Sequence, residues 1–229
     1  MTELLTISIL PVMLTLLAFQ AGLFLQKKLR SPLCNPILVA VILVLLFMAV
    51  TGMDLETYQS GATFLSWLIT PATVCLAISM YEQFQVLRKN IPAILTAVAA
   101  GAVSCLLMVL GLSLLFGLDR TLTVSLLPKS VTTAIGVPLS QMAGGLAPIT
   151  TAVIILTGIT ASVLGPTLCL LFRLTDDIAR GVAFGTAGHV VGTTRASEMS
   201  PLAGAVSSLS LVVAGLLTAI VLPLVTNFI

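Results

Sequence analysis

The sequence predicts an all-α polytopic integral membrane protein with about six full spans plus two broken or re-entrant helical segments. Two observations lead to this prediction. The 229 residues are 58% hydrophobic and only 8% charged, with a mean hydropathy of +1.19, whereas soluble domains contain about 25% charged residues. Apolar runs also alternate with short charged linkers, and a membrane-spanning helix needs about 20 mainly apolar residues. The composition therefore excludes a soluble domain.

The chain is predicted to form a single transmembrane domain, residues 1–229, whose N-terminal part, 1–117, contains four spans. The first apolar run is followed, rather than preceded, by basic residues, so we expect a retained span and not a cleaved signal peptide. Two segments, 121–143 and 181–200, are apolar but are interrupted by Pro, Gly and charge, so we expect broken helices there. The six full spans are predicted at 4–25, 36–52, 63–81, 91–117, 147–172 and 202–227.

Basic residues predict the orientation in the membrane. Cytoplasmic loops are enriched in Lys and Arg, and KKLR at 27–30 follows the first span, so the N-terminus is expected outside. RKN at 88–90, two spans later, then falls inside again. If segment 121–143 is re-entrant, the basic linker 173–180 also lies inside, as the rule favours; if it crosses, that linker lies outside.

An internal repeat relates the two interrupted segments. SLLPKSVTTAIGVPLSQ (125–141) aligns with FGTAGHVVGTTRASEMS (184–200) at an offset of 60, and the apolar spans that follow also align. The repeat units are residues 121–172 and 177–229. If each interrupted segment is a re-entrant hairpin, each unit has an odd number of crossings and the copies are inverted. Inverted repeats with broken helices are typical of secondary transporters.

The few charges inside the apolar regions indicate where a functional site lies. Of the eighteen charged residues, fifteen lie in loops or at span ends, and the other three are Lys129, Arg195 and Glu198. All three belong to the interrupted segments, as does the only histidine, His189. Because a charge at the centre of a bilayer costs about 3 kcal/mol or more, it usually has a partner, a water-filled cavity or a function.

The PKSVTT motif predicts an anion site. Pro128 fixes φ and lacks an N–H, so it suits the first position of a helix. The unpaired N–H groups that follow, the Lys129 ammonium and the hydroxyls of Ser130, Thr132 and Thr133 would together bind a small anion, most simply a carboxylate. Lys129 and Thr133 stand four residues apart and would share a helix face. Alternatively, Lys129 only extends from a span end to the headgroups.

The GHVVGTTRASE motif repeats this design. Gly188 and Gly192 loosen the backbone, and Thr193 or Thr194 can cap a following half-helix. His189 is a candidate to bind substrate or carry a proton, because its ordinary pKa lies near physiological pH. The alternative for His189 is a hydrogen-bonded core histidine.

Arg195 and Glu198 are spaced i,i+3, so they can pair and reduce the cost of burying either charge. They are candidates for a charge or proton relay, or for a purely structural pair.

Several function classes are disfavoured. The chain has no H-E-x-x-H motif and one histidine, and it shows no believable nucleophile set, so we expect no enzyme, metal site or cofactor. Its four cysteines are far apart, and the net charge of +2 does not indicate nucleic-acid binding. No filter motif of an ion channel is present in the sequence.

The segments LPKSVTTAIG, GGLAPITTAVIILTGI and GHVVGTTRASEMSPLAGAVSSL resemble the signature regions of the LrgB/CidB family. The resemblance covers essentially the whole chain and is strongest from about residue 120 onward. Ala134 stands where the family usually has proline, and Gly188 where it usually has serine, which leaves the substrate details open. The matching positions are Pro128, Lys129, Ser130, Val131, Thr132, Thr133, His189, Gly192 and Thr193.

The resemblance implies a multi-pass protein of the bacterial inner membrane, commonly made beside a small LrgA/CidA-like membrane protein. Such bacterial pairs have been described as holin- and antiholin-like controllers of murein hydrolase activity and autolysis. A plastid relative is a glycolate/glycerate transporter. Three hypotheses follow: a secondary transporter of small monocarboxylates such as glycolate, glycerate, lactate or pyruvate, with optional proton coupling; a holin-like pore or lysis regulator acting through homo-oligomers; and a passive anion channel.

Overall fold

The computed structural model describes residues 2–29 and 35–227; Arg30 and Cys34, which entered the sequence analysis, lie outside these ranges. The described chain is all-helical, which confirms the predicted fold class. It divides into two compact units, Met1–Cys75 and Leu76–Ile229, which are described separately. The first unit contains α1 (Thr2–Leu29), α2 (Pro36–Thr51), α3 (Leu55–Gly61) and α4 (Thr63–Trp67), and α5 (Ile69–Glu82) begins in it and ends in the second unit.

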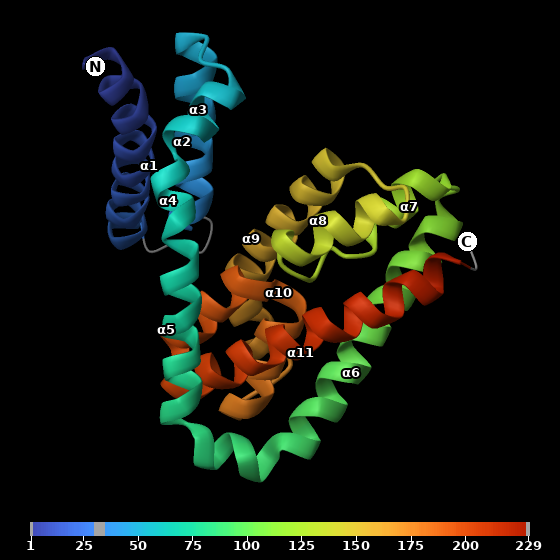
Figure 1. Cartoon of the computed structure of the whole chain (residues 1–229). Helices are drawn as coiled ribbons and strands as arrows, with labels where there is room; N and C mark the ends of the chain where they lie inside the picture. Colours follow the sequence, from blue (N-terminus) through green and yellow to red (C-terminus); the bar gives the residue numbers. More distant parts are fainter. Residues whose placement is uncertain (1, 30–34, 228–229) are drawn as a thin grey trace. The chain divides into compact units, whose positions relative to one another are not determined.

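In the first unit, α1 packs along α2 (Figure 1). A Cβ atom added at Gly22 would lie 2.7 Å from the carbonyl oxygen of Pro36, so a larger residue there would separate the two helices. The Tyr58 hydroxyl lies 2.6 Å from the Thr15 hydroxyl and ties α3 to α1. These close contacts hold α1, α2 and α3 together as a small helical hairpin with one short helix against it.

Five helices in the described ranges are long and apolar enough to cross a membrane. The predicted span at 36–52 is not one of them, because α2 has only 16 residues. At 1.5 Å per residue it is about 24 Å long, which is less than the roughly 30 Å of a bilayer core. Asn35 caps its start, and Gly52, with φ 69°, ends it. The five candidates are Ile9–Leu29, Thr63–Glu82, Phe84–Leu115, Ala147–Leu171 and Pro201–Thr226.

The second unit contains both interrupted segments. Segment 121–143 forms two short helices, and segment 181–200 belongs to a helix that contains one residue with non-helical dihedral angles, His189. The internal repeat, the inverted relation between its units, and whether either segment crosses or re-enters, stay predictions. The helices are α6 (Phe84–Leu115), α7 (Arg120–Leu126), α8 (Thr133–Met142), α9 (Ala147–Leu171), α10 (Asp177–Met199) and α11 (Pro201–Thr226).

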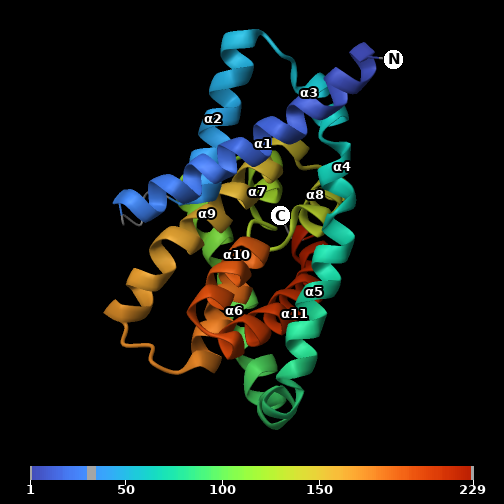
Figure 2. The same cartoon turned by 90° about the vertical axis from the view of Figure 1, so that its left-hand side faces the viewer.

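The most extensive packing in the second unit joins α10 to α11, which lie side by side in both views (Figures 1 and 2). Small residues allow this close approach, as is typical of helices packed in membranes. A Cβ atom at Gly181 would lie 2.7 Å from the carbonyl oxygen of Ala203, and one at Gly185 would meet the Ser207 carbonyl. The Ser208 hydroxyl donates to the Gly204 carbonyl within α11, so its polar group is satisfied in the buried interface.

Candidate functional site

The interruption between α7 and α8 places polar side chains inside the second unit. The Asp119 carboxylate caps α7 by accepting a hydrogen bond of 2.9 Å from Leu122 N–H. Pro128 lacks the N–H that a continuing helix would need, so α7 ends before it. Leu127, Pro128 and Val131 are buried and anchor the turn. In the turn, Lys129 therefore follows the buried Leu127 and Pro128 and precedes the buried Val131.

The next helix begins later than the sequence analysis predicted. α8 begins at Thr133, after the cap residue Thr132, and not at Pro128. The expectation that Lys129 and Thr133 share a helix face is therefore wrong. The physical reason is a tight turn, in which the Val131 N–H donates to the Pro128 carbonyl and delays the helix. Thr132 is half-buried and its side chain makes no cap hydrogen bond, while Thr133 is exposed.

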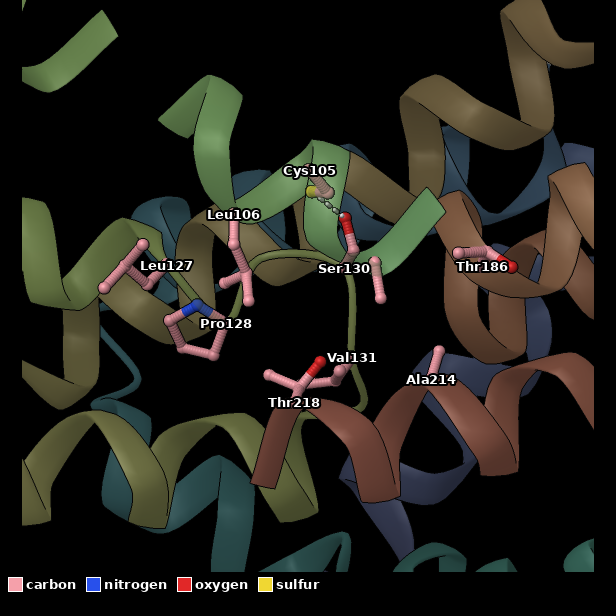
Figure 3. Close-up of a pocket in the computed structure, with 10 residues that line it drawn as sticks. Cys105, Leu106, Leu127, Pro128, Ser130, Val131, Thr186, Ala214 and Thr218 are labelled. Atoms are coloured by element: carbon pink, nitrogen blue, oxygen red, sulfur yellow. Dashed lines mark hydrogen bonds between the residues drawn. The ribbon is translucent and has the colours of Figure 1, made fainter. Parts of the chain in front are cut away.

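Three side chains of different chemistry meet at this turn. The Lys129 ammonium donates to the Ser130 hydroxyl at 3.3 Å. The Ser130 hydroxyl lies 3.2 Å from the Cys105 thiol of α6, as Figure 3 shows. The hydroxyl is thus held between the cation and the thiol, and the ammonium keeps donors free for a further partner.

A cavity of about 710 Å³ extends from this turn between α6 and the first half of α10. Its wall is mainly apolar, and Lys129 is the one Lys or Arg lining it among the described residues. Ser104, Ser130 and Thr186 add hydroxyl groups to the wall, and Asp176 is also part of the lining. A single cation beside hydroxyl groups in an apolar wall is suited to bind one small carboxylate.

The second interruption is a sharp bend in α10. His189 has φ 43° and ψ −137°, so its backbone occupies a region that residues with side chains rarely adopt. Gly192, one turn later, approaches the Phe184 carbonyl so closely that an added Cβ atom would lie 2.5 Å from its oxygen. Gly188 packs in the same way on Ala161 of α9. Glycine at both positions allows the two halves of α10 to fold against each other and against α9.

The His189 ring contacts α9 and does not line the Lys129 cavity. Its Nε2–H donates to the Ile154 carbonyl at 2.9 Å, and the side chain is buried. A Cβ atom at Gly158 would lie 2.6 Å from the ring, so only glycine leaves room for it. This geometry matches the hydrogen-bonded core histidine of the sequence analysis more closely than a substrate ligand.

The two threonines that were expected to cap a half-helix lie inside it, because the break is at His189, four residues before Thr193. The Thr193 hydroxyl donates to the His189 carbonyl and is 2.9 Å from the Ser207 hydroxyl of α11. The Thr194 hydroxyl donates to the Val190 carbonyl and is exposed. Thr193 thus holds the bend against α11, whereas Thr194 points away from it.

Arg195 and Glu198 form the ion pair that their spacing predicts, on a partly exposed face of α10. The Glu198 side chain is 55% exposed. An exposed i,i+3 pair of this kind stabilises a helix by only a few tenths of a kcal/mol. Neither residue lines the Lys129 cavity.

Buried hydroxyl groups form hydrogen bonds that join α7 and α8 to the start of α9. The Ser125 hydroxyl donates to the Thr121 carbonyl and accepts the Leu146 N–H at 2.8 Å. The Thr150 hydroxyl donates to Ser140 at 2.7 Å and joins α9 to α8. These bonds satisfy polar groups that would otherwise be unpaired where α7 and α8 approach the start of α9.

We expect Ser125→Ala to lower the free energy of unfolding by about 1–2 kcal/mol, because it removes a fully buried hydroxyl that bonds both the Thr121 carbonyl and the Leu146 N–H. Thermal unfolding in detergent micelles measures this change. The exposed Ser66 of α4 is the matched control, and Ser66→Ala should leave the unfolding temperature unchanged. Equal effects of the two substitutions would contradict the assigned role of Ser125.

The sequence analysis missed the part of the wall that α6 supplies. Gly101, Ser104 and Cys105 line the cavity, but they lie in the predicted span 91–117, which contains no charged residue. The run of small residues at 99–102 was the available signal, since small residues mark close helix packing. Thr186 was also missed, although it lies in the interrupted segment three residues before His189.

The chain is similar to proteins of a known membrane-protein family. The model of the LrgB-like family matches residues 15–228. The holin-like protein CidB of two strains of Staphylococcus epidermidis is 32% identical to the chain over 216 residues, which covers 94% of each protein. No solved structure gives a significant match.

Proposed function

The chain belongs to the LrgB-like family, and we propose that it is a secondary transporter that moves small monocarboxylates across a bacterial membrane. The observation that supports this proposal is the cavity of about 710 Å³ with Lys129 in its otherwise mainly apolar wall. Glycolate, glycerate, lactate and pyruvate each carry one carboxylate for the ammonium and a hydroxyl or carbonyl for the neighbouring hydroxyl groups.

Ser130 and His189 were both predicted to bind substrate. Ser130 keeps that role in the proposal, whereas His189 takes a different one. Ser130 is a candidate ligand, because its hydroxyl is hydrogen-bonded to Lys129 and lines the same cavity. His189 is a candidate hinge residue, because its backbone is strained and its ring is bonded to α9. The half-helix 177–188, which forms one wall of the cavity, ends directly before this hinge.

Proton coupling is a second element of the proposal. Glu198 is a candidate proton carrier because it is partly exposed and on the half-helix that follows the hinge. Its partner in the ion pair is Arg195. Uptake driven by an imposed pH gradient, compared between the natural protein and Glu198→Gln, tests this element.

A holin-like pore or a regulator of murein hydrolase activity and autolysis is the second candidate function. The observation in its favour is that the similar Staphylococcus epidermidis proteins are named holin-like. This function would require assembly of many copies and would not require a charged cavity. A small LrgA/CidA-like membrane protein is the proposed partner for either function.

Flux measurements in proteoliposomes separate the two candidates. Purified protein is reconstituted, and uptake of labelled lactate is measured beside release of a trapped dye of about ten times its mass. Saturable uptake without dye release is expected for the transporter. Dye release with unsaturable lactate flux would instead support the pore, and the same assay with the small partner added tests whether that protein is required.

A further inference from the structure

We propose that a small cavity beneath the α7–α8 interruption is the closed gate of the route past Lys129, and that its walls select solutes by size. This inference rests on the proposed transport function. The gate cavity, drawn in Figure 3, lies between α6, the turn after α7, α10 and α11. Its lining residues include Leu106, Val131, Thr186, Ala214 and Thr218.

Three cavities of the second unit adjoin one another through shared walls. The Lys129 cavity and the gate cavity share Cys105, Ser130 and Thr186. On the other side, the gate cavity shares walls with a third cavity between α6 and α11. The gate cavity and the third cavity share Ala102, Leu106 and Thr218. The gate cavity therefore lies between the large cavity and the groove formed by α6 and α11.

The volumes show that the gate is closed. The large cavity measures about 710 Å³, the gate cavity about 10 Å³ and the third cavity about 30 Å³. A single water molecule needs about 10–15 Å³ on this measure. The gate cavity therefore has room for about one water molecule and not for a carboxylate. Most of its wall is apolar, as in constrictions that stop ions by excluding water.

Some walls of the gate belong to continuous helices, and others lie at or near an interruption of helical structure. Ala102 and Leu106 belong to α6, and Ala214 and Thr218 to α11; both are long helices. Ser130 and Val131 belong instead to the turn between α7 and α8, where the helical hydrogen bonding is interrupted. Thr186 lies on α10, three residues before the strained His189. We assign the movement to the turn, whose helical hydrogen bonding is interrupted, while the walls on α6, α10 and α11 stay in place.

Thr186 lies where the large cavity and the gate cavity meet. It is only 7% exposed, and its hydroxyl has no hydrogen-bond partner among the described residues. Its methyl group packs on Gly101, where an added Cβ atom would lie 3.0 Å away, and Figure 3 shows the hydroxyl directed away from the Ser130 side. A buried unpaired hydroxyl is unfavourable. A carboxylate that passes from the large cavity into the gate would give this hydroxyl a partner.

Paired substitutions on α6 test the gate by lactate uptake into proteoliposomes. Ala102→Leu fills the gate cavity and should reduce uptake at least tenfold, whereas Leu106→Ala widens it and should raise uptake severalfold and admit six-carbon carboxylates such as hexanoate. The matched controls Ala100→Leu and Leu107→Ala are on exposed positions of the same helix and should leave uptake unchanged. A misfolded variant loses uptake, so the gain at Leu106→Ala cannot arise from damage to the fold.

A binding measurement keeps the gate separate from the carboxylate site. In a Cys34→Ser, Cys75→Ser background, lactate should protect Cys105 from a maleimide, and this protection should persist in Ala102→Leu. Uptake equal to that of the natural protein in both gate variants would overturn the gate and leave the transporter standing. A fall in both variants, with the protection of Cys105 by lactate intact in both, would also overturn it, because widening the gate in a folded protein must raise flux. Absence of uptake by the natural protein would overturn the transport function and the gate with it.

Discussion

Replacing Lys129 with alanine is expected to reduce lactate uptake into proteoliposomes about 30-fold or more. Lys129 is the one Lys or Arg that lines the large cavity among the described residues. Removing one member of a charge pair shielded from water costs about 2 kcal/mol or more, and about 1.4 kcal/mol corresponds to a factor of ten in affinity. The loss should therefore appear as a raised KM, measured from uptake over a range of lactate concentrations.

The matched variants for this prediction are Lys129→Arg and Lys89→Ala. Arginine keeps the charge, so Lys129→Arg should retain part of the uptake, although its planar fork is larger than an ammonium. Lys89 is exposed near the start of α6 and does not line the cavity, so Lys89→Ala should transport normally. Normal uptake by Lys129→Ala would show that the lysine only extends toward the headgroups, and it would remove the main support for a carboxylate transporter.

Replacing Gly158 with alanine is expected to lower the free energy of unfolding by about 2–6 kcal/mol. The added Cβ atom would lie 2.6 Å from the His189 ring and would force it away from α9. Overpacking of this kind costs about 1–3 kcal/mol, and the lost hydrogen bond to the Ile154 carbonyl leaves a buried ring nitrogen unpaired at a similar cost. Thermal unfolding in detergent measures the sum.

A double-mutant cycle distinguishes this contact from a general effect of the new side chain. In a His189→Ala background the ring is absent, so Gly158→Ala should destabilise the protein much less than in the natural sequence. Gly111→Ala is the control on α6, where nothing lies within 4 Å of an added Cβ atom. Alanine favours a helix over glycine by about 1 kcal/mol, so the control should be neutral or stabilised. Equal costs of Gly158→Ala in both backgrounds would contradict the contact.

Much of the fold could be predicted because hydropathy and interruptions are local properties of the sequence. The Pro, Gly and charged residues at 121–143 and 181–200 correctly indicated two broken helices. The length of α2 was overestimated because residues 36–52 are uniformly apolar, and apolarity alone does not show that the Asn35 cap and the Gly52 turn limit the helix to 16 residues. The start of α8 was misplaced because proline can either begin a helix or precede a turn.

The site was predicted only in part, because the sequence shows which residues are unusual but not what they face. Lys129 and Ser130 do lie together at a cavity. His189 aligns with Lys129 in the predicted repeat, yet its ring faces Ile154 on another helix. The wall contributed by Gly101 and Cys105 consists of residue types that are ordinary in a membrane span, so only the tertiary structure reveals it.

The packing of α10 on α11 affects how the chain enters the membrane during synthesis. α10 is not among the helices apolar enough to cross a bilayer alone, and its Thr193 hydroxyl is paired with Ser207 of α11. Lipid offers no partner for such a group. We therefore expect the last two helices to enter the bilayer together, because the small-residue face of α10 packs on α11 over the most extensive interface of the second unit. A ribosome that stops after Met199 would leave α10 without the surface against which it folds.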